Sequence, residues 1–233
     1  MQSKQYELCR EVLKRLHDSG VLPHLVLIGS WCMLLYRQYF RKSDFIPAIK
    51  TRDMDFAVPV PSSFHGVVDV PILLKDLGFI LSYKGEEGYM ILQHPELMIE
   101  MLVPERGRGH DKPFPLPKLG MNAQALRLLD LAMKTTIHVE FDGIPVIVPH
   151  PAVFAIHKLL VSERRTDQAK ALRDVEAAVL LMRLLVSTGD TELKRCYESI
   201  PKKWQQTVVN VLKTADMPDI IATLSPHVHH PHK

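Results

Sequence analysis

Apolar residues recur at two spacings along the first part of the chain, and each spacing predicts a different element. Between residues 4 and 18 they recur every three to four positions, as in a helix, whereas Leu25 to Ile28 form a short continuous apolar run. Gly29 and Ser30 end this run, and a second helical pattern continues to Phe40 with Ser30 in the N-cap position. The pattern predicts a helix, a buried strand, a Gly-Ser turn and a second helix.

The middle of the chain has the short, partly alternating apolar runs that are typical of β-strands. Strands are predicted at residues 54–58, 79–83, 89–93 and 97–103, with a helix at 67–77, a long surface loop at 104–120, a short helix at 123–133 and a hairpin of strands 136–141 and 144–148. The hairpin turns at Asp142-Gly143, a residue pair that favours positive φ. This region therefore predicts a sheet.

From Pro151 onward the pattern is helical. Helices are predicted at residues 151–164, 166–187, 192–199 and 202–214. The expected organisation is a sheet-containing domain at 1–149, a helical domain at 150–226 and a flexible histidine-rich tail at 227–233.

Composition narrows the class of protein. With 233 residues and 46% hydrophobic residues, the chain can bury a core, and it contains no uncharged apolar run of membrane-spanning length. The polar start of the chain, Met1 to Tyr6, lacks the apolar stretch of a secretory signal, so we expect a cytoplasmic protein with no membrane partner. The three cysteines predict reduced thiols, and the net charge of +3 predicts no strong field for polyanions.

Three carboxylates are the candidates for chemistry. Asp53 and Asp55 are two residues apart in an extended segment, so they share one face of a strand and together suit a cation such as Mg²⁺ or Mn²⁺. Glu100 interrupts an apolar strand, where an unpaired carboxylate is costly to bury. The alternatives are a solvated acidic pair, a Glu100 that faces water, or a buried ion pair of Glu100 with Lys158 or an arginine.

The order of these features, from the strand and Gly29-Ser30 through Asp53-Met54-Asp55 to Glu100, resembles the nucleotidyltransferase superfamily that shares its fold with polymerase beta. Residues 51–56 are similar to the T-x-D-x-D-hydrophobic form of bacterial minimal and abortive-infection-type members. The resemblance implies an α+β fold, with a mixed sheet flanked by helices and followed by a helical C-terminal bundle. It also implies that Gly29 and Ser30 hold a triphosphate, that Asp53 and Asp55 bind metal, and that Glu100 completes the metal site.

A second resemblance covers residues 151–159, Arg164-Arg165 and 170–174, which are similar to the region after the sheet in bacterial nucleotidyltransferases. It implies that Lys158 and Arg164 bind substrate, with Asp174 orienting Lys158. The alternative is an ordinary salt bridge. Trp31 departs from the family pattern, and of core packing, nucleobase stacking and a modified pocket we expect core packing.

The implied activity is a metal-dependent enzyme of EC 2.7.7 type. It would move a nucleoside monophosphate from a nucleoside triphosphate such as ATP to an acceptor hydroxyl, with Mg²⁺ or Mn²⁺ as cofactor and release of pyrophosphate. The acceptor stays open among a protein, a tRNA end and a small molecule. The alternatives are an inactive nucleotide-binding or regulatory module, for example one half of a toxin–antitoxin pair, and a nucleic-acid-binding protein that uses the loop from Arg106 to Lys118.

Overall fold

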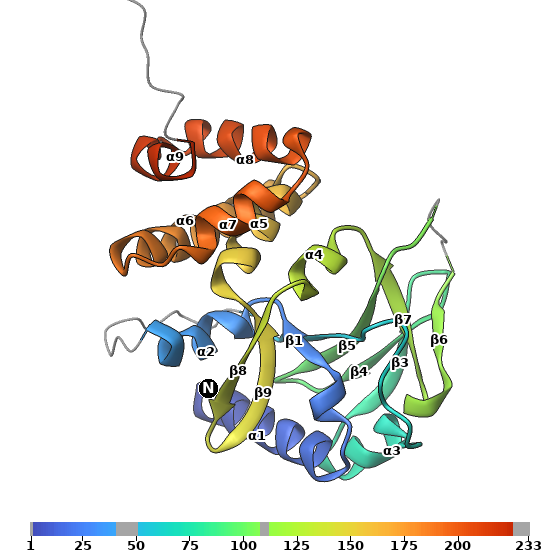
Figure 1. Cartoon of the computed structure of the whole chain (residues 1–233). Coiled ribbons are helices and arrows are strands. Elements are labelled where there is room, and N and C mark those ends of the chain that lie inside the picture. The colour runs from blue at the N-terminus through green and yellow to red at the C-terminus, as the bar shows by residue number, and fades with distance from the viewer. Residues whose placement is uncertain (1, 41–50, 108–111, 226–233) are drawn as a thin grey trace, which may run out of the picture. The chain divides into compact units, whose positions relative to one another are not determined.

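The computed structural model describes residues 2–40, 51–107 and 112–225 (Figure 1). The chain divides into two compact units, Met1–Pro149 and His150–Lys233. The first unit contains the sheet with its helices, and the described part of the second is built from helices (Figure 1). The protein is therefore of the α+β class, as predicted. The histidine-rich tail lies outside the described residues.

The described part of the first unit contains strands, helices and three 3₁₀ turns, η1 (Leu22–His24), η2 (Lys75–Leu77) and η3 (Pro117–Leu119). Its helices are α1 (Gln2–Asp18), α2 (Trp31–Phe40), α3 (Val70–Leu74) and α4 (Leu129–Met133). Its strands are β1 (Val26–Ile28), β2 (Asp53–Ala57), β3 (Ile80–Lys84), β4 (Tyr89–Gln93), β5 (Met98–Pro104), β6 (Phe114–Leu116), β7 (Met121–Leu126), β8 (Thr136–Phe141) and β9 (Ile144–Pro149).

The sheet is mixed, and β5 is its central strand. The order along the main path is β1-β2-β5-β4-β3, with β2 parallel to β5 and the other pairs on this path antiparallel. Residues 98–100 of β5 pair with β4, whereas residues 102–104 pair with β7, so β5 exchanges one neighbour for another along its length. Strands β8 and β9 form a separate hairpin that turns through positive φ at Asp142 and Gly143, as the sequence predicts.

The two faces of the sheet differ in polarity. On one face, side chains from β1, β2 and β5 are almost fully buried: Leu27, Met54, Phe56, Ile99 and Met101. On the opposite face, an apolar cluster fills only one part of the surface. It joins strand residues to α4: Val26, Ile28, Ala57, Leu102, Leu129 and Ala132. Because strand residues two apart share a face, Asp53 and Asp55 lie on the same face as Ala57, beside this cluster.

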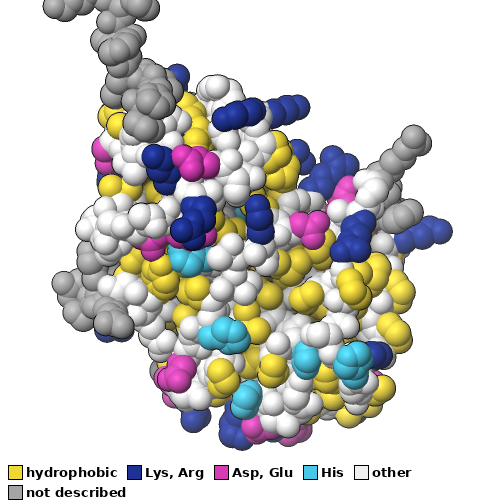
Figure 2. Space-filling view, viewed as in Figure 1, with side chains coloured by type: hydrophobic (Ala, Val, Ile, Leu, Met, Phe, Trp, Pro, Cys, Tyr) yellow, Lys and Arg dark blue, Asp and Glu magenta, His cyan; other side chains and the backbone are white. Residues whose placement is uncertain are grey.

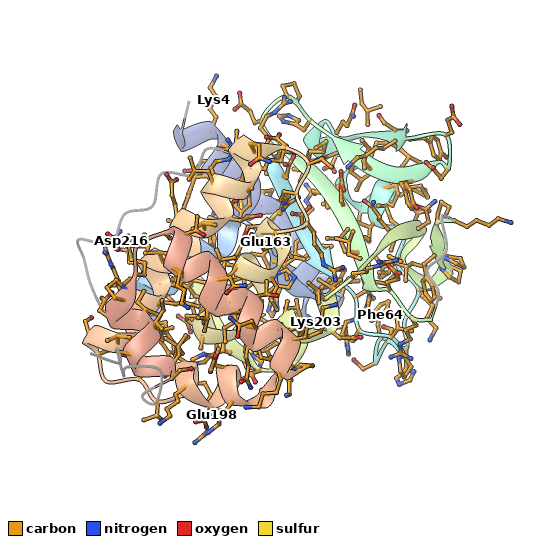
Figure 3. All side chains as sticks on the ribbon, turned by 90° about the horizontal axis from the view of Figure 1, so that it is seen from above. Lys4, Phe64, Glu163, Glu198, Lys203 and Asp216 are labelled. Carbon is orange, nitrogen blue, oxygen red and sulfur yellow. The ribbon has the colours of Figure 1, made fainter. Side chains whose placement is uncertain are left out.

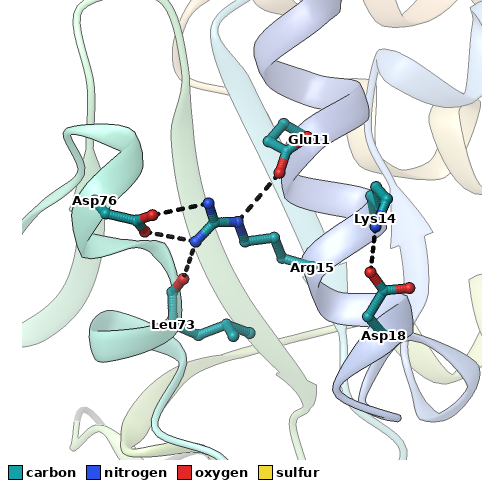
Figure 4. A network of polar contacts seen from close by, with 6 residues as sticks. All are labelled: Glu11, Lys14, Arg15, Asp18, Leu73 and Asp76. Atoms are coloured by element: carbon teal, nitrogen blue, oxygen red, sulfur yellow. Dashed lines mark hydrogen bonds and ion pairs between the residues drawn. The ribbon is translucent and has the colours of Figure 1, made fainter.

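A polar network ties α1 to the segment of α3 and η2 (Figure 4). The Arg15 guanidinium donates to both carboxylate oxygens of Asp76, at 2.5 and 2.8 Å, and to the Leu73 carbonyl oxygen at 3.2 Å. Its hydrogen bonds lower the pKa of the Asp76 carboxyl. Since the pair is solvent-exposed, its main effect is to fix the geometry of this segment.

Two local predictions were wrong, and a third was right in type but too long. The segment 104–120 is not a plain loop, because it contains β6 and η3, although residues 108–111 lie outside the described part. The helix expected at 123–133 is strand β7 followed by the short helix α4, because parallel pairing with β5 overrides the helical preference of its alanine, glutamine and leucine residues. The helix expected at 67–77 is confined to Val70–Leu74 and continues as η2, where Gly78 ends it at φ +90°.

The helical unit contains α5 (Pro151–Ser162), α6 (Gln168–Ser187), α7 (Glu192–Ser199), α8 (Lys202–Thr214) and α9 (Pro218–Leu224). The first four match the predicted ranges closely, but α9 was missed. It has only 7 residues and follows Asp216, which has a positive φ of 54°. A segment this short carries little periodic signal.

Some hydrophobic side chains of the first unit remain open to water (Figure 2). The most exposed large ones include Ile80 and Tyr83 on the edge strand β3 and Val67 and Ile72 before and within α3. The cysteines Cys9, Cys32 and Cys196 are buried free thiols, as expected. Within the described residues, no helix is both long enough and apolar enough to cross a membrane.

Candidate active site

The register of the central strands brings the predicted carboxylates to one face of the sheet. Asp55 of β2 is the direct partner of Glu100 on the parallel strand β5, and Asp53 is the partner of Met98. Cross-strand partners point to the same face, and residues two apart on a strand do so as well. Asp53, Asp55 and Glu100 therefore share the face that the apolar cluster leaves uncovered.

Gly29 lies directly against Asp55. Its φ is +79°, and a Cβ atom added to it would lie 2.8 Å from Asp55 Oδ2. Both the backbone conformation and the close approach exclude a larger residue here. The neighbour that Gly29 admits in this structure is Asp55, a candidate metal ligand, while the role of Gly29 in holding a triphosphate stays a prediction.

Ser30 joins Gly29 to the start of α2. At this start the N–H groups of Cys32 and Met33 donate to the carbonyl oxygens of Gly29 and Ser30, at 3.2 and 3.1 Å. Trp31 follows at once but is only 1% exposed, so it packs in the interior as expected. Its indole Nε1 is buried without a hydrogen-bond partner among the described residues.

Glu100 is bound by a lysine that the sequence did not single out. Lys84 Nζ, from the end of β3, donates to Glu100 Oε1 at 3.0 Å and to Oε2 at 3.4 Å. The Glu100 side chain is only 12% exposed, whereas that of Lys84 is 54% exposed. The hypothesis that Glu100 faces water was therefore wrong, because β5 lies between β2 and β4. The alternative of a buried ion pair with Lys158 or an arginine was wrong as well, because the cation is Lys84 and its side chain is 54% exposed.

The donor atoms of this face suit a hard divalent cation. Asp53 and Asp55 offer carboxylate oxygens from one strand, which is the ligand type of Mg²⁺ and Mn²⁺. In the part of the chain that the structure describes, no three His, Cys, Asp or Glu side chains lie close enough to hold a metal ion. Glu100 is the third carboxylate of this face, and its two oxygens are held by Lys84. The three carboxylates therefore match a divalent cation in donor type and share one face, but their spacing in this structure does not form a three-ligand site.

The helical unit contains a second charged cluster. Lys158 Nζ lies 2.5 Å from Asp174 Oδ1, and Arg165 Nε lies 3.0 Å from Asp174 Oδ2. Lys158 also lies over the ring of Phe154, 5.3 Å from its centroid. The predicted pair of Lys158 and Asp174 is therefore formed. Arg164 is exposed in the turn that follows Glu163, which is labelled in Figure 3.

His157 lies beside this charged cluster. Its Nδ1 is buried without a hydrogen-bond partner among the described residues. Burial, together with the charges of Lys158 and Arg165, lowers its pKa to about 4, although Asp174 opposes the shift. His157 is therefore neutral at pH 7. In the sequence, only its place in an apolar helix points to its burial.

The fold and the carboxylate face define a class of protein, and the comparison with known families agrees. The profile of a family described as Nucleotidyltransferase matches residues 7–202. The chain belongs to this nucleotidyltransferase family.

A solved structure supports this fold at low sequence identity, and a second is similar more distantly. An antigenic nucleotidyltransferase-like protein from Paracoccidioides brasiliensis is similar with a TM-score of 0.51 and 15% identity, over 94% of this chain and 92% of that chain. The antibiotic-resistance factor ANT(2″)-Ia, solved in complex with adenylyl-2″-tobramycin, gives a TM-score of 0.47 and 11% identity, over 91% of this chain and 99% of that chain. No curated protein matches the chain.

Proposed function

We propose that this protein transfers a nucleoside monophosphate from a nucleoside triphosphate to an acceptor hydroxyl and releases pyrophosphate, with Mg²⁺ or Mn²⁺ as cofactor. The observation that carries the proposal is the set of three carboxylates on one sheet face, with Asp55 and Glu100 in register and Gly29 against Asp55. Membership of the nucleotidyltransferase family supports the same reaction class.

Each residue of this face has a role in the proposed reaction. Asp53, Asp55 and Glu100 hold the divalent ion, which when bound neutralises phosphate charge and orients an in-line displacement. Gly29 and Ser30 admit the triphosphate to the start of α2, where the positive end of the helix dipole favours phosphate. The residues of the helical unit that the resemblance assigns to substrate binding, Lys158 and Arg164, remain predictions.

The bond changes follow the usual balance of nucleotidyl transfer. The acceptor oxygen forms a bond to the α-phosphorus as the bond from that phosphorus to the bridging oxygen breaks, and the electron pair leaves with pyrophosphate. The acceptor proton passes to a carboxylate oxygen, for which Asp55 and Glu100 are the candidates. The acceptor itself is open among a protein, a tRNA end and a small molecule.

The direct test is incubation of the purified protein with each α-labelled nucleoside triphosphate and Mg²⁺ or Mn²⁺, in the presence of candidate acceptors. We expect metal-dependent pyrophosphate release together with a labelled acceptor. Label transfer that persists in excess chelator would contradict the metal requirement.

A binding experiment separates an enzyme from an inactive module. Because carboxylates repel phosphate until metal bridges them, nucleotide and metal should stabilise the protein together and far less apart. At about 100 times Kd the gain is roughly 2.7 kcal/mol, or a melting shift of several degrees. Stabilisation without turnover would favour the inactive nucleotide-binding module, and no shift would exclude a nucleotide site.

A further inference from the structure

We propose that Lys84 is a positioning residue that acts through Glu100: it occupies this carboxylate in the metal-free protein, and a divalent ion has to displace it to bind there. The inference rests on the proposed metal site. It adds a residue that is not part of the carboxylate set, and it makes the metal affinity a property of β3 as well as of β2 and β5.

The strand register shows how Lys84 reaches this position. Glu100 is the partner of Ile91 on β4, and Ile91 is the partner of Ser82 on β3. Lys84 is two residues beyond Ser82, so its side chain emerges on the face that carries Glu100 and Asp55. Its ammonium therefore reaches across β4 to Glu100.

The contacts of Lys84 show why a metal ion would have to compete with it for Glu100. Lys84 Nζ is within hydrogen-bond distance of both Glu100 oxygens, at 3.0 and 3.4 Å, so one cation engages the whole carboxylate. A carboxylate that is 12% exposed needs such a partner, because its charge is poorly solvated. Once the ion is bound there, the lysine is no longer needed as a counter-charge.

The difference in exposure between Lys84 and Glu100 allows a metal ion to replace Lys84 at Glu100. The Lys84 side chain is 54% exposed, so its ammonium can turn to water with little loss of solvation, while Glu100 stays in place. The aliphatic stem can rotate without disturbing the sheet, since β3 is the end strand of the main path. Lys84 thus neutralises part of the negative charge of Asp53, Asp55 and Glu100 until a metal ion binds.

The test is Mn²⁺ affinity of the full chain, measured by calorimetry without nucleotide. Lys84→Met should tighten Mn²⁺ binding about five- to tenfold, because the competitor is gone. Lys84→Arg should stay near the wild-type affinity, because it restores a cation. Lys75→Met, an exposed lysine of η2, makes the same change in net charge and should alter affinity less than twofold.

Two further variants separate the possible failures. In a Glu100→Gln background, Lys84→Met should have no further effect on Mn²⁺ affinity, because Lys84 acts through Glu100. If Asp55→Asn weakens Mn²⁺ binding but Lys84→Met leaves it unchanged or weaker, the role of Lys84 is wrong while the metal site stands. If Asp55→Asn leaves Mn²⁺ binding unchanged, the proposed metal site itself fails.

Discussion

Glu100 in the sheet unit and Asp174 in the helical unit are both shielded carboxylates, but they meet their cations in different ways. Glu100 has one lysine on both oxygens, and that lysine is 54% exposed. Asp174 is 7% exposed and gives each oxygen to a different cation, Lys158 at 13% and Arg165 at 39% exposure.

This difference separates a replaceable partner from a fixed one. If Lys84 moves away from Glu100, its ammonium is already largely solvated and loses little. If Lys158 moves away from Asp174, its ammonium stays shielded from water and has no counter-charge. We infer that Asp174 mainly organises the turn between α5 and α6, and that Glu100 belongs to a site whose cation can change. The following predictions test this contrast.

The largest expected effect is a loss of turnover in the sheet unit, where the proposed role of the carboxylates is catalytic. Asp53→Asn and Asp55→Asn should each lower nucleotidyl transfer about a thousandfold or more, because each removes a metal ligand. Their melting temperatures should match or slightly exceed that of the wild type, because one of two repelling charges is gone. Turnover and melting curves check this, with the exposed Asp130→Asn as control. A variant that unfolds, or one that keeps near-normal turnover, would make the pair structural.

The helical side should respond to pH through His157. Its folded-state pKa is about 4, below the usual 6.5, so the unfolded chain binds the proton more tightly. The contribution of the neutral His157 ring to the free energy of unfolding is therefore fully present above pH 6.5. As the pH falls toward 4, this free energy decreases by about 2–3 kcal/mol.

Urea unfolding at pH 7, 5.5 and 4.5 measures this loss. His157→Gln should flatten the pH dependence in that window, and His138→Gln, at an exposed position, should not. An unchanged slope in His157→Gln would mean that its ring is open to water.

Asp174→Asn should destabilise the protein by about 2 kcal/mol. It leaves two cations around a neutral amide, but Arg165 is partly exposed and water screens some of the penalty. Thermal unfolding should show a fall of several degrees, and Asp219→Asn on α9, an exposed position, should show almost none. A fall no larger than that of the control would remove the contrast between the two carboxylates.

Glu100→Gln should have the smallest effect on the metal-free protein, within about 1 kcal/mol of wild type. Loss of the Lys84 pair is offset by weaker repulsion with Asp55, its cross-strand partner. With Mn²⁺ present, the variant should gain less stability than the wild type. Melting curves with and without Mn²⁺ test both expectations. Destabilisation by several kcal/mol without metal would mean that Glu100 is a structural residue like Asp174.

Elements with a strong local pattern could be predicted from the residues alone. The strand, Gly-Ser turn and helix from Val26 to Phe40, the hairpin at Asp142-Gly143 and four of the C-terminal helices follow from periodicity and turn chemistry. The alternation of Asp53 and Asp55 placed both on one face of a strand, because successive strand residues point to opposite faces.

Features that depend on pairing between distant segments could not be predicted in this way. Nothing local in residues 121–126 shows that they will lie parallel to β5, and β7 was therefore read as a helix. The partner of Glu100 depends on the register of three strands, β3, β4 and β5, which brings Lys84 across from 16 residues away. A periodic pattern reports which face a residue takes, but the identity of its neighbour is fixed by long-range packing of the whole sheet.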